Sequence, residues 1–256
     1  MLADPYDAFL LDIDGVLYRW PEPIAGAAEA VAVLRKAGKR IAFVTNNSSR
    51  TPARVAERLV SVGVDARPEE VVSSALATAT LLADRGVRSA FVVGEEGLLE
   101  ALADAGIRVL DASADAVDVV VVGFDRGADY SRLRDASVLV ERGVSLVASN
   151  ADPSFPAPGG ESWPGAGALL AAIETTTGTR GEVVGKPEAP LFERALASAG
   201  GGRPLVVGDR LDTDIAGASR LGWDSVLVLT GTTRRGDVES SSWKPTFVID
   251  DLAGLV

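Results

Sequence analysis

Short apolar runs alternate with longer amphipathic segments along almost the whole chain. The apolar runs have the length of strands, and strands are expected at residues 8–12, 40–44, 90–93, 118–122, 145–148, 183–184, 205–207 and 225–229. The segments between them predict helices at 24–37, 52–62, 95–105, 131–142 and 168–176, and a loop rich in proline and glycine at 152–167. This alternation is typical of parallel sheets joined by helical crossovers, so the expected fold class is α/β.

The same pattern indicates an inserted domain. A second set of strands and helices begins near residue 79 and ends near residue 181, and the segments after it resume the style of the first block. We therefore predict a core made of residues 1–78 and 182–256, with an inserted α/β domain at 79–181.

Four of the expected strands end in polar turns. The turns are Asp12-Ile13-Asp14-Gly15, Thr45-Asn46-Asn47, Gly185-Lys186-Pro187, and Gly208-Asp209 shortly before Asp214. In an open parallel sheet the carboxyl ends of the strands share one edge, where ligands bind, so these turns are expected to converge on one pocket. Asp12 and Asp14 would point the same way if their strand continued through both, and such a pair needs a positive partner.

Composition narrows the chemistry of that pocket. The chain of 256 residues contains no cysteine and no histidine. Disulfides, thiolate chemistry, Ser-His-Asp catalysis and imidazole-bound zinc are therefore excluded, which leaves acid–base chemistry to carboxylates and lysine. The net charge of -11 disfavours nucleic acid and anionic membranes as partners. No apolar run could span a bilayer and no export signal is recognisable, so a cytoplasmic protein is expected.

The four turns, in this order, resemble the motifs of the haloacid dehalogenase superfamily of phosphotransferases. Thr45-Asn46-Asn47-Ser48-Ser49, Gly185-Lys186-Pro187 and the insertion are similar to subfamily IIA, which has a large C2-type cap and includes nagD-like, p-nitrophenylphosphatase-like, phosphoglycolate and glycerol-phosphate phosphatases. One cap segment departs from this pattern, because relatives often have Asn-Pro-Asp where this chain has Asn150-Ala151-Asp152. The resemblance implies a Rossmann-like doubly wound parallel sheet as the core and an α/β cap domain as the insertion.

The resemblance also implies the roles of the acidic residues. Asp12 would attack phosphorus to form an aspartyl-phosphate, and Asp14 would protonate the leaving oxygen and then activate water. Mg²⁺ prefers oxygen ligands, which suits Asp12, the backbone carbonyl of Asp14, and Asp209. Asp214 would orient a metal-bound water or Lys186 from behind these ligands. The cation would supply the positive partner that the Asp12 and Asp14 pair requires.

The remaining polar residues of the turns are expected to hold the phosphate. By resemblance, the Thr45 hydroxyl and the Asn46 amide group contact phosphoryl oxygens, with Asn47 nearby. Lys186 would contribute a compact positive charge toward the phosphate and Asp12.

The expected function is a Mg²⁺-dependent phosphatase acting on a small organic phosphate monoester of sugar, glycerol, glycolate or nucleotide type. Two alternatives stay open at this point. One is a phosphomutase or phosphotransferase that uses the same intermediate, and the other is a non-catalytic regulatory protein that binds a phosphate ligand. The expected partner is a small phosphorylated metabolite, and self-association into a homo-oligomer is left open.

Overall fold

The computed structural model describes residues 1–19, 21–114, 116–156 and 161–256. The described chain divides into two compact units, which are treated separately below. The core unit comprises Met1–Thr45, Pro52–Val72 and Lys186–Val256, and the cap unit comprises Asn46–Thr51 and Ser73–Gly185. The predicted boundary between residues 78 and 79 falls inside a helix of the cap unit. The limits 79–181 of the inserted domain stay a prediction.

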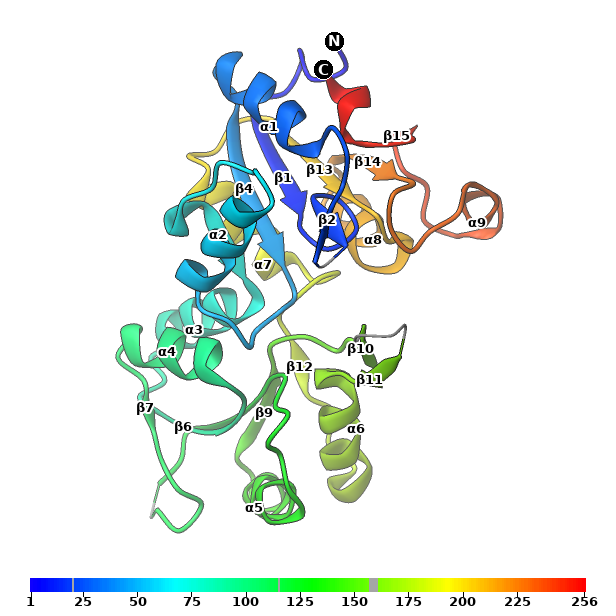
Figure 1. The fold of residues 1–256 in the computed structure, drawn as a ribbon. Helices are drawn as coiled ribbons and strands as arrows, with labels where there is room; N and C mark the ends of the chain where they lie inside the picture. Colours follow the sequence, from blue (N-terminus) through cyan, green and yellow to red (C-terminus); the bar gives the residue numbers. More distant parts are fainter. Residues whose placement is uncertain (20, 115, 157–160) are drawn as a thin grey trace. The chain divides into compact units, whose positions relative to one another are not determined.

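A six-stranded sheet forms the centre of the core unit (Figure 1). Its strands are β1 (Ala8–Asp12), β4 (Arg40–Thr45), β5 (Val71–Ser73), β13 (Pro204–Gly208), β14 (Asp224–Val228) and β15 (Phe247–Ile249), in the order β15-β14-β13-β1-β4-β5. β1 pairs in parallel with both β4 and β13, and β14 pairs in parallel with β13 and β15. The chain builds outward from β1 on one side and from β13 on the other, so the predicted doubly wound sheet is confirmed, with its switch point between these two strands.

Helices and short turns of the core unit surround this sheet. They are α1 (Ala27–Lys36), α2 (Pro52–Ser61), η1 (Pro68–Glu70), α7 (Ala189–Ser198), η3 (Leu211–Ile215), α8 (Ala216–Arg220), α9 (Arg235–Ser240) and η4 (Leu252–Leu255). A small antiparallel pair, β2 (Tyr18–Arg19) and β3 (Glu22–Pro23), follows β1. The buried face of α1, with Val31 and Leu34 one turn apart, packs in the same apolar cluster as Phe9 and Leu11 of β1.

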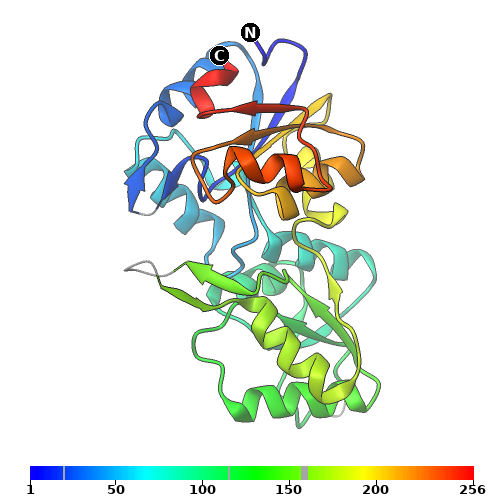
Figure 2. The same cartoon turned by 90° about the vertical axis from the view of Figure 1, so that its right-hand side faces the viewer.

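The two ends of the chain meet in the core unit. Ala3 N–H donates to the Leu255 carbonyl oxygen at 3.1 Å, and Figure 2 shows the two termini side by side. The contact joins the residues before β1 to η4, whose side chains Leu252 and Leu255 belong to the same apolar cluster as β1.

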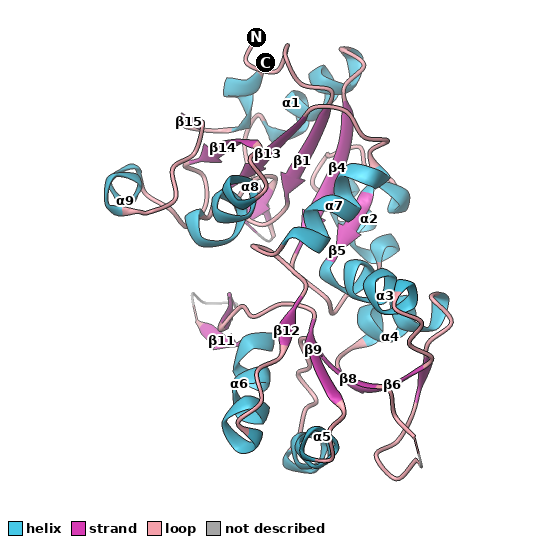
Figure 3. Ribbon diagram, turned by 180° about the vertical axis from the view of Figure 1, so that it is seen from behind, coloured by secondary structure: helices cyan, strands magenta, loops and turns pink. Residues whose placement is uncertain are grey.

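A second parallel sheet forms the centre of the cap unit. Its strands are β6 (Ser89–Val93), β7 (Arg108–Val109), β8 (Val119–Val122), β9 (Ser145–Ala148) and β12 (Glu182–Val183), in the order β12-β9-β8-β6-β7 with parallel pairing throughout. Helices α5 (Tyr130–Glu141) and α6 (Ala166–Thr177) share one apolar cluster with β6, β8 and β9. Helices α3 (Ser74–Asp84) and α4 (Glu96–Asp104) pack against each other (Figure 3).

The segment predicted as a loop at 152–167 is partly ordered into strands, so that prediction is wrong in part. β10 (Ser154–Pro156) and β11 (Ser162–Pro164) form an antiparallel pair, in which Phe155 lies opposite Trp163. Residues 157–160 of the expected loop lie outside the described residues. Strands of three residues are too short to carry an alternating pattern, and the proline and glycine content of the segment favours a loop.

Within the residues that the structure describes, every helix is too short or too polar to cross a lipid bilayer.

Candidate active site

The switch point of the core sheet carries two carboxylates. Asp12 is the last residue of β1, and Asp209 follows Gly208, the last residue of β13. The two strands are in register, with Leu11 opposite Val207, so both acids emerge at the same edge of the sheet. This is the edge at which the sequence predicts a pocket.

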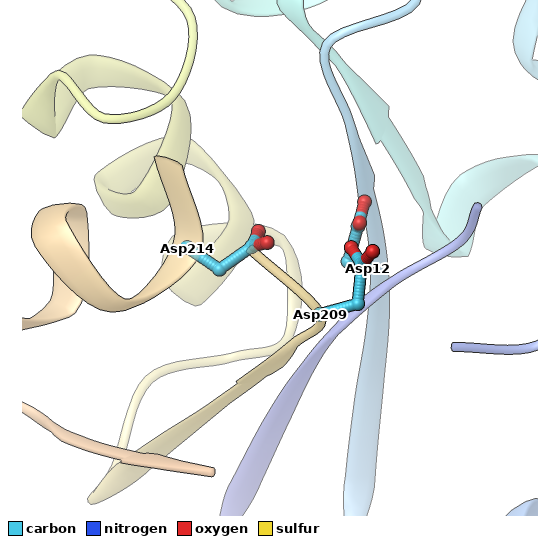
Figure 4. Close-up of side chains that lie close together, drawn as sticks. All are labelled: Asp12, Asp209 and Asp214. Atoms are coloured by element: carbon cyan, nitrogen blue, oxygen red, sulfur yellow. The ribbon is translucent and has the colours of Figure 1, made fainter. Parts of the chain in front are cut away.

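A third carboxylate joins them from the segment after β13. Asp214 lies in η3, one turn of π-helix, and oxygen atoms of Asp12, Asp209 and Asp214 all lie within 4.8 Å of one another (Figure 4). All three residues are buried, with exposed fractions of 8%, 3% and 1%. Gly208 allows this arrangement, because a side chain at that position would overlap the Asp214 carboxylate.

Lys186 supplies the positive charge that this cluster needs. Its Nζ donates to Asp12 Oδ1 at 2.6 Å and to Asp214 Oδ1 at 2.7 Å, and the side chain is buried. Lys186 therefore ties the end of β1 to η3 and fixes the orientation of both carboxylates.

Burial and like charge perturb the titration of the cluster. Burial raises the pKa of the Asp12 carboxyl well above its usual value; Lys186 opposes this shift, while Asp214 and Asp209 reinforce it. The pKa of Asp209 is also raised, first by burial and then by the charge of Asp214. Burial alone would lower the pKa of Lys186, but Asp12 and Asp214 raise it above its usual value. The ammonium is therefore held charged, and the carboxylates have more negative charge than Lys186 alone can balance.

The donor set fits a divalent cation with a preference for oxygen. Three ionised carboxylates and one ammonium leave a net charge of about −2, and Mg²⁺ requires oxygen atoms about 2.1 Å away, hence within about 4.2 Å of each other. The separations of up to 4.8 Å among the carboxylate oxygens come close to that requirement. Asp12 and Asp209 are the residues best placed to hold the ion, because Asp214 already receives the Lys186 ammonium and the Arg210 N–H.

Asp14 differs from Asp12 in its surroundings. β1 ends at Asp12, so the strand does not continue through both acids, and Asp14 lies in a turn bridged to Tyr18. Its side chain is exposed, whereas that of Asp12 is buried. The side chain of Asp14 is not part of the three-carboxylate cluster.

Of the predicted phosphate ligands, Thr45 belongs to the core unit. It is the last residue of β4 and is buried, and the residue before it, Val44, lies opposite Asp12 in the sheet. Thr45 therefore lies one residue beyond the position opposite Asp12, at the same edge of the sheet.

Asn46 and Asn47 belong to the cap unit and are held by contacts within it. Asn46 Nδ2 donates to Asp152 Oδ2 at 3.0 Å, and Asn150 Nδ2 donates to the Asn46 carbonyl at 2.8 Å. Asn47 Oδ1 accepts from the backbone N–H and the hydroxyl of Ser49. The segment with Asn150 and Asp152, where the chain departs from the related pattern, therefore positions the first asparagine after β4.

Sequence reasoning missed a further segment next to the carboxylates. Thr232 N–H donates to Asp209 Oδ2 at 2.6 Å, and the Thr230 hydroxyl donates to the Gly15 carbonyl at 2.7 Å. Both threonines follow β14, whose carboxyl end lies at the same sheet edge as those of β1 and β13. The polar turn after that strand was the available signal, although it contains no charged residue.

Comparison with known proteins identifies the family. Residues 9–108 match the family model of haloacid dehalogenase-like hydrolases, and residues 183–255 match a second model described as HAD-hydrolase-like. An acid sugar phosphatase of Staphylococcus epidermidis is 36% identical over 250 residues, which cover 96% of this chain and 95% of that protein. The chain belongs to the haloacid dehalogenase-like hydrolases. The resemblance seen in its motifs is thereby confirmed.

Solved structures extend the similarity to the fold. The glycerol phosphate phosphatase of Mycobacterium tuberculosis, in complex with calcium, has a TM-score of 0.94 at 37% identity and covers 99% of this chain and 76% of its own. The same relative is also known in complex with magnesium. The 4-nitrophenylphosphatase of Thermotoga maritima has a TM-score of 0.92 at 34% identity, covering 100% of this chain and 98% of its own. The predicted α/β core with an inserted α/β cap is thus the fold of this hydrolase.

Proposed function

We propose that this hydrolase is a Mg²⁺-dependent phosphatase that cleaves a small organic phosphate monoester through an aspartyl-phosphate on Asp12. The observation that carries the proposal is the contact of Lys186 with Asp12 inside a buried cluster of three carboxylates. Support comes from relatives whose names specify sugar phosphate, glycerol phosphate and nitrophenyl phosphate as substrates. The partner is accordingly a small phosphorylated metabolite.

In the first step a carboxylate oxygen of Asp12 attacks phosphorus, and the bond from phosphorus to the alcohol oxygen breaks. Asp14 gives its proton to the departing alcohol oxygen. In the second step Asp14 takes a proton from water, the water oxygen attacks phosphorus, and the Asp12 carboxylate leaves as inorganic phosphate forms.

The other residues of the site orient Asp12 and the phosphoryl group and neutralise their negative charge. Lys186 holds Asp12 through Oδ1 and places positive charge beside the incoming phosphoryl group. Thr45, at the end of β4, offers its hydroxyl to phosphoryl oxygens, and the chain continues directly into Asn46 and Asn47. Mg²⁺ at Asp12, Asp209 and the Asp14 carbonyl supplies charge neutralisation for phosphate and carboxylate together. Asp214 keeps Lys186 in place from η3.

The test is phosphate release from a panel of monoesters: sugar phosphates, glycerol phosphate, phosphoglycolate, nucleoside monophosphates and 4-nitrophenyl phosphate. The assay is run with Mg²⁺, with EDTA, and with Asp12→Asn. We expect release that needs Mg²⁺ and is lost in the variant, together with a phosphate adduct on the peptide that contains Asp12 after an acid quench of the wild-type reaction.

Other outcomes would contradict the proposal. An isomerised sugar phosphate without phosphate release would identify a mutase, and ligand binding without turnover would identify a regulatory binder. A fully active Asp12→Asn variant would remove the nucleophile assignment.

The expected cytoplasmic location stays a prediction.

A further inference from the structure

The turn after β14 contacts two functional turns of the core unit at once. Residues 230–233, called the threonine strap here, have the sequence Thr-Gly-Thr-Thr and follow the strand next to β13. Thr232 N–H donates to Asp209 Oδ2 at 2.6 Å, and Thr233 N–H donates to the Asp209 carbonyl at 3.3 Å. The strap therefore holds both the side chain and the backbone of Asp209.

The other end of the strap holds the turn after β1. The Thr230 hydroxyl donates to the Gly15 carbonyl at 2.7 Å, and Arg19 Nε donates to the Thr230 carbonyl at 2.5 Å. Gly15 directly follows Asp14, whose backbone carbonyl is one of the proposed Mg²⁺ ligands. A hydrogen bond to the Gly15 carbonyl fixes the orientation of the peptide units next to that ligand.

Two glycines allow the strap, Asp209 and the turn after β1 to touch. A Cβ on Gly15, which has φ +83°, would lie 2.6 Å from Asp209 Oδ2 and 3.1 Å from Gly231 Cα. A Cβ on Gly231 would overlap the Asp209 side chain. The close approach of the three backbones thus depends on the absence of a side chain at positions 15 and 231.

We propose that the threonine strap is a positioning element, which sets the Asp209 carboxylate and the turn at Asp14 and Gly15 in the geometry that binds the divalent cation. The inference rests on the proposed function for the identity of the cation. Its physical basis is preorganisation: a carboxylate already fixed by a backbone N–H does not have to be ordered when the ion binds.

The test measures Mg²⁺ binding without substrate. Titration of Mg²⁺, followed by the rise in unfolding temperature, reports affinity, and unfolding in EDTA reports stability without metal. Ca²⁺ serves as a second probe. Thr230→Val keeps the shape of the side chain and loses one hydrogen bond, so we expect about fivefold weaker Mg²⁺ binding. Gly231→Ala displaces Asp209 and is expected to weaken binding further, by about tenfold or more.

Two matched controls separate positioning from stability. Thr246→Val removes a threonine hydroxyl that bonds to Ser225 and Asp224 at the opposite end of β14. Gly236→Ala adds a methyl group where nothing lies within 4 Å. Both controls are expected to bind Mg²⁺ as the wild type does. In the phosphatase assay, Thr230→Val should need more Mg²⁺ for half-maximal rate and recover the wild-type kcat when Mg²⁺ is saturating.

The outcomes distinguish this inference from the proposed function. Equal Mg²⁺ affinity in the wild type and Thr230→Val would overturn the strap's role and leave the phosphatase untouched. Weaker binding in Thr230→Val, together with no phosphate release by the wild type from any monoester, would support the strap and refute the phosphatase. If Gly231→Ala does not fold, the Mg²⁺ affinity of Thr230→Val alone decides the role of the strap. A wild type that binds neither Mg²⁺ nor Ca²⁺ would overturn both the role of the strap and the proposed metal-dependent phosphatase.

Discussion

The core unit and the cap unit are built in the same way but bury different kinds of polar side chain. Each has a parallel sheet with helices packed against it. In the core unit the buried polar residues include Asp12, Lys186, Asp209 and Asp214. In the described part of the cap unit they are neutral, and they are Asn46, Ser48, Ser49, Thr51, Ser73, Ser74, Thr78, Ser89, Ser137, Ser149 and Asn150.

The difference shows where the chemistry lies. A buried charge is costly unless a partner compensates it, so a buried cluster with excess negative charge marks a candidate functional site. Neutral amides and hydroxyls satisfy one another by hydrogen bonding and stabilise a loop without storing charge. Parallel α/β construction by itself therefore does not indicate catalysis, and the ends of the strands have to be compared.

The largest effect is expected on catalysis, from Asp209→Asn. Its matched control is Asp212→Asn, three residues later. Asp209 is buried in the cluster, whereas the Asp212 side chain is 70% exposed and pairs with Arg210. Loss of one metal-binding carboxylate should lower kcat/KM by about a thousandfold, equivalent to about 4 kcal/mol. Steady-state phosphate release at several Mg²⁺ concentrations measures it. Equal losses in both variants would remove the distinction between a buried and an exposed acid.

Lys186→Met should have the next largest effect, on stability. It leaves the buried carboxylates without their ammonium, and removal of one partner of a buried ion pair lowers the free energy of unfolding by roughly 3 kcal/mol. Urea unfolding in EDTA measures the loss, and Mg²⁺ should restore part of it. Lys244→Met is the control, since Lys244 Nζ donates to the backbone carbonyls of Val238 and Glu239 near the surface. Unfolding unaffected by Lys186→Met would contradict the charge balance described for the core unit.

Asn150→Ala probes the neutral network of the cap unit. Its Nδ2 is buried and donates to the Asn46 carbonyl, so its removal should lower the free energy of unfolding by about 1–2 kcal/mol. The network carries no charge, so Mg²⁺ affinity should stay within about twofold of the wild type. Chemical denaturation and the Mg²⁺ titration together check both statements. A large loss of Mg²⁺ affinity would contradict the view that the charged cluster of the core unit, and not the neutral network of the cap unit, binds the ion.

The smallest effect is expected on the stability of the core unit, from the Glu70 carboxylate, which is paired with two arginines. Burial alone would raise the pKa of Glu70, but hydrogen bonds from Arg35 and Arg67 outweigh it and lower the pKa to about 2. An acid with a lowered pKa stabilises the folded state above its unfolded value, 4.5, and that contribution is lost as the pH falls from there to about 2.

Glu70→Gln should therefore lower the free energy of unfolding by about 1 kcal/mol at pH 7, after allowance for solvent screening of a partly exposed site. The difference from the wild type should shrink below pH 5 and vanish near pH 2. Urea unfolding across this range measures it. A difference that is constant with pH would mean that packing, and not the ion pairs, accounts for the loss.

Much of the fold was predictable because long strands and helices leave a periodic pattern. The strands expected at 8–12 and 145–148 agree with β1 and β9 residue by residue. The helix expected at 131–142 begins and ends one residue earlier as α5. β5, β10, β11 and β15 have three residues each and were not predicted, because so few residues show no alternation and form strands only through their neighbours.

The site was predictable where charge interrupts an apolar run. Asp12, Lys186 and Asp209 stand out for that reason. Asp214 was expected to orient Lys186 or a metal-bound water from behind the metal ligands. The short spacing of its carboxylate, within 4.8 Å of those of Asp12 and Asp209, depends on the π-helical turn of η3 and on the missing side chain at Gly208. The contacts of Thr230 and Thr232 were missed, because their signal was only a polar turn after β14, and uncharged threonines after a strand are common in turns.

Periodicity and composition were enough to predict the class of the fold, the polar turns that follow four of its strands, and the chemistry that remains when cysteine and histidine are absent. Those properties are local, because periodicity and composition act over a few residues. Which strand ends meet depends on contacts between distant parts of the chain. The tertiary structure brought Lys186 within 2.6 Å of Asp12 across 174 residues of chain, and it placed the threonine strap against Asp209. The order of strands in the core sheet sets these neighbours, and that order depends on the packing of the whole unit.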